Sequence, residues 1–175
     1  WYFVRRRRQY RQIIFERETN LSEVIRTGTI VDSNVSAQLL RLLFVKNTPL
    51  HDGAVIIRGN KIYAAACYLP LSNNLHLNKD LGTRHRAGIG ISESTDCISV
   101  IVSEETGYIS MARGGVLTRN ITPDILRKLL REGLAPQDKG KKAGSKVAGL
   151  FRLADRVSKK RKDKKKRDGD GNGKA

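Results

Sequence analysis

Two apolar runs joined by a two-residue turn limit the fold of this chain more than any other feature. Residues 54–58 read AVIIR and residues 61–68 read KIYAAACY, and only Gly59 and Asn60 separate them. Apolar runs of this length are typical of buried strands, and a Gly-Asn pair between them fits the tight turn of a β-hairpin. We therefore expect an antiparallel hairpin here, so the fold has to contain a sheet.

Helix and strand signals alternate on both sides of this hairpin. We expect helices at residues 20–28, 33–45, 83–94 and 122–132, and further strands at 13–16, 29–31, 97–103, 108–112 and 113–118. The clearest helix start is Thr122, which can cap a helix that begins with Pro123 and carries Asp124 near its positive end. Helices and hairpins mixed in this way indicate the α/β or α+β class, with a largely antiparallel or mixed sheet.

Two glycines fall inside the helix expected at residues 83–94. Gly88 and Gly90 both lower helix propensity, so another requirement has to justify them. We expect that they allow either close packing of the helix or the close approach of a ligand.

Positive charge is concentrated at the end of the chain. The net charge is +17, and residues 139–175 hold 15 Lys and Arg residues against 4 Asp and Glu residues. This composition predicts a basic, largely disordered tail. An alternative is an amphipathic helix on an anionic membrane surface, or an electrostatic contact with nucleic acid. The apolar residues at helical spacing that favour the amphipathic helix are Val147, Leu150, Phe151, Ala154 and Val157.

The remaining bulk properties favour a cytoplasmic protein. Cys67 and Cys97 both lie in apolar runs, so we expect buried free thiols rather than a disulfide. No signal peptide is visible, and no apolar run approaches the roughly 20 residues that span a bilayer.

A carboxylate at the start of the hairpin is the first candidate for chemistry. Asp52 precedes Gly53 and Ala54, whose small side chains would let a ligand approach the backbone closely. Asp52 could act as a general base or as a metal ligand. Alternatively, it is a turn aspartate that caps its own backbone, because Asp-Gly pairs are common in turns.

The second candidate is an anion site at residues 83–86. Thr83, Arg84, His85 and Arg86 place a hydroxyl, two guanidinium groups and backbone donors at an expected helix N-terminus. Cations are unfavourable at that end of a helix unless an anion binds there. Alternatively, the arginines are surface residues that pair with Glu93 or Glu104. The turn at residues 103–106, which reads SEET, is a weaker candidate for holding a metal or a base edge.

Four stretches together are more specific than any one of them. They read NTPLHDGAVI at 47–56, AAACYLPLS at 64–72, LGTRHRAGIGISE at 81–93 and VIVSEETG at 100–107. In this order they resemble the diadenylate cyclase family, and its membrane-associated branch in particular, from about Phe15 to Leu130. The resemblance implies a twisted mixed β-sheet flanked by helices, and an enzyme that joins two ATP molecules into cyclic di-AMP with loss of two pyrophosphates. It divides the chain into a diverged segment at 1–14, a catalytic domain at 15–134 and the basic tail at 135–175.

The resemblance also assigns roles to matching residues. Asp52 would activate a 3′-hydroxyl, and His51 and Glu105 would hold a divalent metal, Mn²⁺ or Mg²⁺. A histidine ligand suits Mn²⁺ or Co²⁺ better than Mg²⁺, so Co²⁺ is a further candidate. Phosphate binding falls to residues 83–86 with Ser103 nearby. The implied ATP-binding residues are Gly53, Ala54, Tyr68, Leu69, Thr83, Arg84, His85, Arg86, Ser103 and Glu104, of which Tyr68, Leu69 and Glu104 would frame adenosine.

Assembly and location follow from the same resemblance. One subunit that holds one ATP cannot close the ring, so two subunits have to meet face to face as a homodimer. Relatives in this branch imply a membrane regulatory protein and phosphoglucosamine mutase as partners, at the inner face of the cell membrane. The first 14 residues depart from the family pattern, in which transmembrane helices and a strand resembling GALIV precede the sequence ERET found here at 16–19.

Two other functions fit parts of the sequence. A nucleotide-binding scaffold that has lost catalysis is favoured only by the divergence at residues 1–14. A module that binds nucleic acid or an anionic membrane is favoured only by the charge of the tail. No helix-turn-helix or zinc-finger spacing supports nucleic-acid binding, and the phosphate-binding motifs lie outside the tail, so nucleic acid is the least expected partner.

Overall fold

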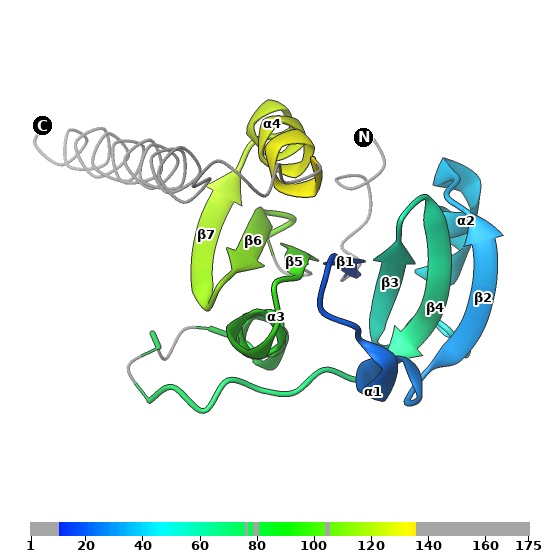
Figure 1. Cartoon of the computed structure of the whole chain (residues 1–175), viewed down its shortest axis with the longest axis horizontal. Helices are drawn as coiled ribbons and strands as arrows, with labels where there is room; N and C mark the ends of the chain where they lie inside the picture. The colour runs from blue at the N-terminus through cyan, green and yellow to red at the C-terminus, as the bar shows by residue number, and fades with distance from the viewer. Residues whose placement is uncertain (1–10, 76, 79–80, 104–105, 136–175) are drawn as a thin grey trace, which may run out of the picture. The chain divides into compact units, whose positions relative to one another are not determined.

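The computed structural model describes residues 11–75, 77–78, 81–103 and 106–135 of the chain (Figure 1). The described residues fall into two compact units that divide between residues 117 and 118. The expectations for residues 1–10 and for the basic tail from residue 136 onward lie outside the described residues. No helix among the described residues combines the length and the apolar character needed to cross a membrane.

A mixed sheet organises the chain and confirms the expected fold class. Its strands are β1 (Arg11–Glu16), β2 (Thr29–Asn34), β3 (Ala54–Arg58), β4 (Lys61–Cys67), β5 (Ile98–Val102), β6 (Ile109–Arg113) and β7 (Val116–Ile121), in the order β2-β4-β3-β1-β5-β6-β7. The central strand β1 pairs parallel with β3 and antiparallel with β5. The predicted hairpin is confirmed, because β3 and β4 pair antiparallel across Gly59 and Asn60.

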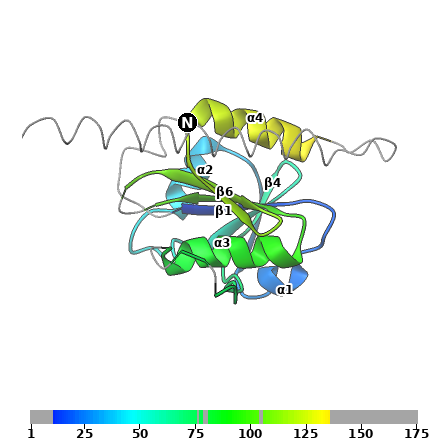
Figure 2. The same ribbon diagram turned by 90° about the vertical axis from the view of Figure 1, so that its left-hand side faces the viewer.

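Helices cover both faces of the sheet within residues 11–117. Helices α1 (Ser22–Ile25) and α3 (Thr83–Ser94) lie on one face, and α2 (Ala37–Leu43) lies on the other (Figure 2). Successive side chains of a strand point to opposite faces of the sheet, so β1 packs against the helices on both faces. Ile14 packs with residues of α1 and α3, whereas Ile13 packs with Leu43 and other residues on the α2 side.

The strand and helix bounds near residue 33 differ from those predicted. Residues 33 and 34 continue strand β2, where Ser33 pairs with Ile62 and Asn34 with Lys61. Helix α2 begins only at Ala37, and its cap is Ser36, whose hydroxyl accepts from the backbone of Leu39 at 3.1 Å. Both Ser33 and Ser36 can cap a helix. Ser33 is paired with β4 in the sheet, so Ser36 becomes the cap of α2. The local sequence does not show this pairing.

Other predicted bounds were also wrong, including those of β7, which spans Val116–Ile121 rather than residues 113–118. Helix α1 spans only Ser22–Ile25, and strand β1 begins at Arg11 rather than at residue 13. Gln12 pairs with Ile101 in the register of β1 and β5 and is buried. Polar side chains at positions 11 and 12 concealed this part of the central strand, because an apolar run is the main local signal for a buried strand.

Close packing explains both glycines of α3. A Cβ atom on Gly90 would lie 2.4 Å from the carbonyl oxygen of Pro70 and 2.6 Å from the amide nitrogen of Ser72. A Cβ atom on Gly88 would lie 2.7 Å from the hydroxyl of Ser99 on β5. Of the two expected reasons for these glycines, close packing is therefore the one that the structure supports. α3 approaches the sheet closely at Gly88 and the loop before the helix at Gly90.

In residues 118–135, helix α4 (Pro123–Leu134) begins as the sequence predicted. The hydroxyl of Thr122 accepts a hydrogen bond from the amide of Ile125 at 3.4 Å, and Pro123 opens the helix. Leu126 and Leu129 are buried and lie about one turn apart. The local start signals were sufficient here because each of them acts within the first turn.

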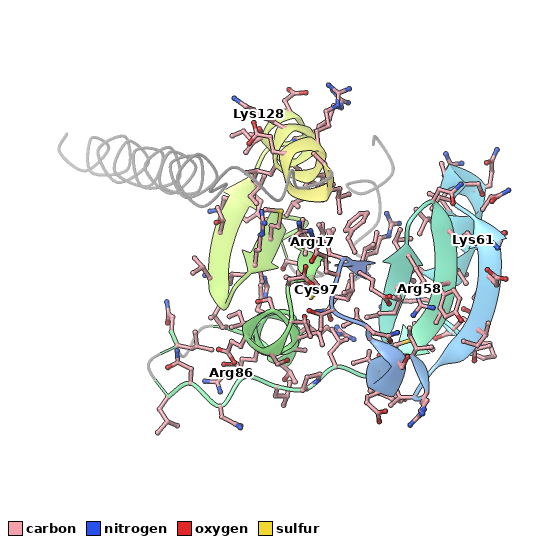
Figure 3. All side chains as sticks on the ribbon, in the orientation of Figure 1. Arg17, Arg58, Lys61, Arg86, Cys97 and Lys128 are labelled. Atoms are coloured by element: carbon pink, nitrogen blue, oxygen red, sulfur yellow. The ribbon has the colours of Figure 1, made fainter. Side chains whose placement is uncertain are left out.

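Asp96 links the segment after β1 to the segment before β5 through hydrogen bonds and an ion pair. Its carboxylate accepts hydrogen bonds from the backbone amides of Thr19 at 2.9 Å and Glu18 at 3.2 Å, and it pairs with Arg17 (labelled in Figure 3) at 3.3 Å. Burial by itself raises the pKa of this carboxyl. The backbone hydrogen bonds and the charge of Arg17 outweigh burial, so the pKa of Asp96 lies below its ordinary value of 3.8.

This lowered pKa predicts a specific loss of stability in acid. The contribution of Asp96 to the free energy of unfolding is fully present above about pH 4 and is lost as the pH falls through the lowered pKa. Asp96→Asn should reduce the unfolding free energy at pH 7 by about 1 kcal/mol, because an amide cannot replace all of these contacts. The variant should also show a flatter pH dependence below pH 4 in chemical denaturation. An unchanged slope would show that Asp96 does not contribute to the acid sensitivity.

Candidate functional site

The predicted site residues gather where strands end and α3 begins. Asp52 and Gly53 immediately precede β3, and residues 83–86 form the first turn of α3. Ser103 follows β5. All of these positions belong to the compact unit of residues 1–117. Glu104 and Glu105 lie outside the described residues, so their predicted contacts with adenosine and metal remain predictions.

The structure brings the two main candidates together. A carboxylate oxygen of Asp52 lies 3.7 Å from a terminal guanidinium nitrogen of Arg84, although 31 intervening residues separate them in the sequence. The side chain of Asp52 is 65% exposed and that of Arg84 is 46% exposed. An exposed pair at this distance contributes little to stability. Both groups therefore remain accessible to a ligand that approaches from solvent.

Gly53 is required by the backbone itself. Its φ angle is +114°, and an added Cβ atom would lie 2.6 Å from the carbonyl carbon of Ala66 on β4. Ala54 is 1% exposed and packs with Ile14 and Ile56 in the core. The need for small residues here thus has a structural reason besides the predicted nucleotide contact. A ligand at this position would meet backbone atoms rather than the methyl group of Ala54.

The first turn of α3 has the features of an anion site. Gly82 caps the helix without a side-chain hydrogen bond, and the first turn contains no acidic residue. Thr83 and Arg84 are exposed, whereas His85 and Arg86 are partly buried (Figure 3 labels Arg86). The positive end of the helix dipole and two arginines therefore meet at one place, which favours a bound anion.

Of the two alternative partners for these arginines, Glu104 lies outside the described residues and Glu93 lies too far along the helix from Arg84. Glu93 follows Arg84 by nine residues on α3, which corresponds to about 13 Å along a helix axis. Its carboxylate instead accepts a hydrogen bond from the hydroxyl of Ser72 at 2.7 Å. Pairing of Arg84 with Glu93 is therefore excluded as the reason for a cation at the start of this helix.

His85 has a partner that the sequence did not reveal. Its Nε2 atom lies 3.4 Å from the hydroxyl of Ser110 on β6, and Ser110 is buried. A serine hydroxyl can donate or accept, so it can stabilise either neutral tautomer of the imidazole ring. Only the register of the sheet under α3 identifies Ser110, because no local motif surrounds it.

Ser103 closes the turn that joins β5 to β6. Its hydroxyl accepts from the amide of Thr106 at 3.3 Å, and its own amide donates to the carbonyl of Tyr108 at 2.9 Å. These contacts give Ser103 a role in the turn. They leave its predicted proximity to the phosphates as a prediction.

His51 is oriented in a way that suits a metal ligand. Its Nδ1 atom lies 2.5 Å from the carbonyl oxygen of Thr48, which can only accept a hydrogen bond. Nδ1 therefore carries a proton, and in the neutral ring Nε2 keeps a lone pair for a cation. Among the described residues, no three His, Cys, Asp or Glu side chains form a metal-binding group. The second predicted ligand, Glu105, is outside that part of the chain.

The predicted adenosine residues follow strand β4. Tyr68 is 65% exposed, and its backbone amide donates to the hydroxyl of Thr27 at 2.9 Å. Leu69 is partly buried against the core beneath α1. An exposed aromatic ring beside a fixed backbone could stack on a base, and the predicted role of Tyr68 is compatible with this geometry.

The two cysteines are inert by position. Cys67 and Cys97 are buried and free, as predicted. Burial raises the pKa of the Cys67 thiol to about 11 and also raises the pKa of Cys97. Neither thiol is a candidate nucleophile at neutral pH, because the thiolate is the reactive form.

Comparisons with known proteins point to one family. Residues 4–117 match the family described as DisA bacterial checkpoint controller nucleotide-binding. The chain is 49% identical over 128 residues to the cyclic di-AMP synthase CdaA of Bacillus subtilis, covering 73% of this chain and 47% of that protein. It is 50% identical over 132 residues to a diadenylate cyclase of Listeria monocytogenes, covering 75% of this chain and 48% of that protein. The chain thus spans about half the length of the curated relatives it matches.

Solved structures give the same result for the fold. The crystal structure of a double mutant of DacA from Staphylococcus aureus matches with a TM-score of 0.73 and 52% identity, covering 77% of this chain and 89% of that one. A hypothetical membrane spanning protein from Bacillus cereus matches with a TM-score of 0.63 and 42% identity, covering 66% of this chain and 56% of that one.

Proposed function

Because this chain belongs to the family of DisA-type nucleotide-binding domains that includes the diadenylate cyclases, we propose that it condenses two ATP molecules into cyclic di-AMP and two pyrophosphates. The resemblance read from the sequence is confirmed at the level of the family. The observation that carries the proposed activity is the 3.7 Å approach of Asp52 to Arg84 at the first turn of α3. It joins a candidate base to a candidate phosphate site.

Each residue of this pair has a distinct part in the proposed reaction. The 3′-hydroxyl of one ATP is a poor nucleophile until a base takes its proton, and Asp52 is the accessible carboxylate for that step. The 3′-oxygen then forms a bond to the α-phosphorus of the other ATP. The bond from that phosphorus to the β-phosphate oxygen breaks, and pyrophosphate leaves. Arg84 and the N-terminus of α3 offset the negative charge on the phosphates.

We propose that a divalent cation binds near this pair. His51 presents a histidine tautomer suited to metal binding, and with Glu105 it would hold Mn²⁺ or Mg²⁺, with Co²⁺ as a further candidate. The cation would supply further charge neutralisation for the triphosphate. His51 itself orients its ring by donating to Thr48, and this contact does not depend on the metal.

We propose that the active species is a homodimer. Each subunit offers one Asp52 and one α3 N-terminus, so it can position one ATP. Two such sites have to face each other for both phosphodiester bonds to form.

The proposed partners at a membrane, a regulatory protein and phosphoglucosamine mutase, rest on the resemblance to the membrane-associated branch. The proposed contact with anionic lipid rests on the basic composition of residues 139–175.

The homodimer predicts that specific activity depends on enzyme concentration. Pyrophosphate release per mole of enzyme should rise steeply around the dimer dissociation constant and then level off. Dimers of wild type with Asp52→Asn should form only one of the two bonds, so a linear diadenylate should accumulate. Mixing wild type with Asp124→Asn, the same substitution at a carboxylate that is 88% exposed at the start of α4, provides the control. Constant specific activity in a protein that remains monomeric by sedimentation would exclude the two-subunit mechanism.

A further inference from the structure

We infer that Tyr108 is an additional substrate-contacting residue of this site, and that its phenolic hydroxyl donates a hydrogen bond to the triphosphate of the bound ATP. The inference deepens the proposed function and rests on it. The sequence does not single out Tyr108, which follows the SEETG turn one residue before β6. The register of the sheet and the position of α3 determine where its side chain lies.

The register of β5 and β6 puts Tyr108 opposite Ser103. The two strands pair antiparallel, with Ile101 opposite Ser110 and Val102 opposite Ile109. The hydrogen bond from the Ser103 amide to the Tyr108 carbonyl, at 2.9 Å, continues this pairing by one step. Residues directly opposite each other have Cβ atoms about 4.5–5.5 Å apart and share a face of the sheet. Tyr108 is therefore the cross-strand neighbour of a predicted phosphate-site residue.

The alternation of side chains along β6 shows to which face of the sheet Tyr108 points. Ala112 packs with Ile89 of α3, and the Ser110 hydroxyl lies 3.4 Å from His85 of the same helix. Side chains two residues apart on a strand share a face, so Tyr108 points to the α3 side like Ser110 and Ala112.

The direction of α3 then places Tyr108 at the start of the helix. From Ser110 to Ala112 strand β6 advances about 6.7 Å, and from His85 to Ile89 helix α3 advances about 6 Å. The strand and the helix therefore run in the same direction. Two residues before Ser110 on the strand comes Tyr108. Four residues before His85 on the helix is a position just before Thr83, where α3 begins. The side chain of Tyr108 thus lies beside the positive end of the helix.

The side chain of Tyr108 is available to a ligand. It is 53% exposed, and within the described residues its hydroxyl has no hydrogen-bond partner. Its surroundings are suited to phosphate rather than to a base, because the N-terminus of α3 and the basic side chains of its first turn favour an anion. A phenolic hydroxyl donates well to a phosphate oxygen, and a charge-assisted bond of this kind is stronger than a neutral one.

The test compares the nucleotide affinities of variants that lack the Tyr108 hydroxyl. Isothermal titration with Mn²⁺ would use α,β-methylene-ATP, which binds like ATP but cannot release pyrophosphate, and adenosine, which has no phosphate. Tyr108→Phe should raise the Kd for the ATP analogue about tenfold and leave the Kd for adenosine within twofold of wild type. Tyr108→Leu should weaken the analogue no more than Tyr108→Phe. Tyr63→Phe, whose ring lies against Arg58 at 3.9 Å and outside the site, should bind both ligands like wild type.

Each other outcome contradicts the inference. An unchanged Kd for the analogue in Tyr108→Phe would exclude the hydrogen bond to phosphate. Equal weakening of adenosine and the analogue would place the contact at the nucleoside instead. The same loss in Tyr63→Phe would show that removal of any tyrosine hydroxyl weakens binding. If wild type bound no ATP analogue at all, the proposed function would fail together with the inference, whereas the other results would leave that function intact.

Discussion

Replacing Asp52 with asparagine is expected to lower turnover about 10²–10⁴-fold while nucleotide affinity stays close to that of wild type. The amide has nearly the same shape as the carboxylate but cannot take the proton of the 3′-hydroxyl. Asp52 is 65% exposed and its ion pair with Arg84 is weak, so the variant should fold normally. Pyrophosphate release measures turnover, and titration with α,β-methylene-ATP measures affinity.

Arg84→Ala provides the matched comparison for Asp52→Asn. It removes the other member of the same ion pair but should weaken nucleotide binding as well as turnover, because a charge-assisted phosphate contact contributes about 1.5–3 kcal/mol. The two variants should therefore separate a chemical role from a binding role. Wild-type turnover in Asp52→Asn would refute its assignment as the base, and unchanged affinity in Arg84→Ala would refute the phosphate contact.

Gly90→Ala is expected to destabilise the protein by about 3 kcal/mol, because overpacking against rigid atoms is costly. The three atoms that its Cβ would meet within 2.4–2.7 Å all belong to the backbone of residues 70–72, which cannot rotate away as a side chain does. In an open helix the same substitution would stabilise by about 1 kcal/mol through helix propensity. The free energy of unfolding from chemical denaturation measures the difference and its sign.

Gly88→Ala is the internal comparison for Gly90→Ala. Its nearest neighbours are the side-chain atoms of Ser99, Ile101 and Gln12, at 2.7–3.1 Å, and side chains can adjust by rotation. The loss of stability should be smaller than for Gly90→Ala. A stabilised Gly90→Ala variant would mean that α3 does not pack as closely against residues 70–72 as the structure indicates.

The parts of the fold that were predictable from sequence depend on local signals. The β3–β4 hairpin follows from Gly59 and Asn60 between two apolar runs, and the start of α4 follows from Thr122 and Pro123. The end of β2 and the start of β1 were predicted wrongly, because distant partners determine them. Ser33 is held in the sheet by Ile62, some 30 residues away, and Gln12 by Ile101 on β5.

The same distinction applies to the candidate site. Asp52 and Arg84 lie in motifs that the sequence displays, so both were found before the fold was known, and their 3.7 Å approach supports the grouping. Ser110 lies in no motif and is identified only because β6 runs beneath α3. The glycines of α3 attracted attention as exceptions to helix propensity, but only the packing shows that they fit neighbouring atoms rather than a ligand.

The central claim is that this chain joins two ATP molecules into a cyclic dinucleotide. The most direct measurement is the mass of the nucleotide products after incubation of the purified protein with ATP and Mn²⁺, with Asp52→Asn as the matched control. We predict cyclic di-AMP and pyrophosphate as the products of wild type, and a strong reduction of both in the variant. ATP that binds but is recovered unchanged, or is converted only to ADP or AMP, would contradict the account.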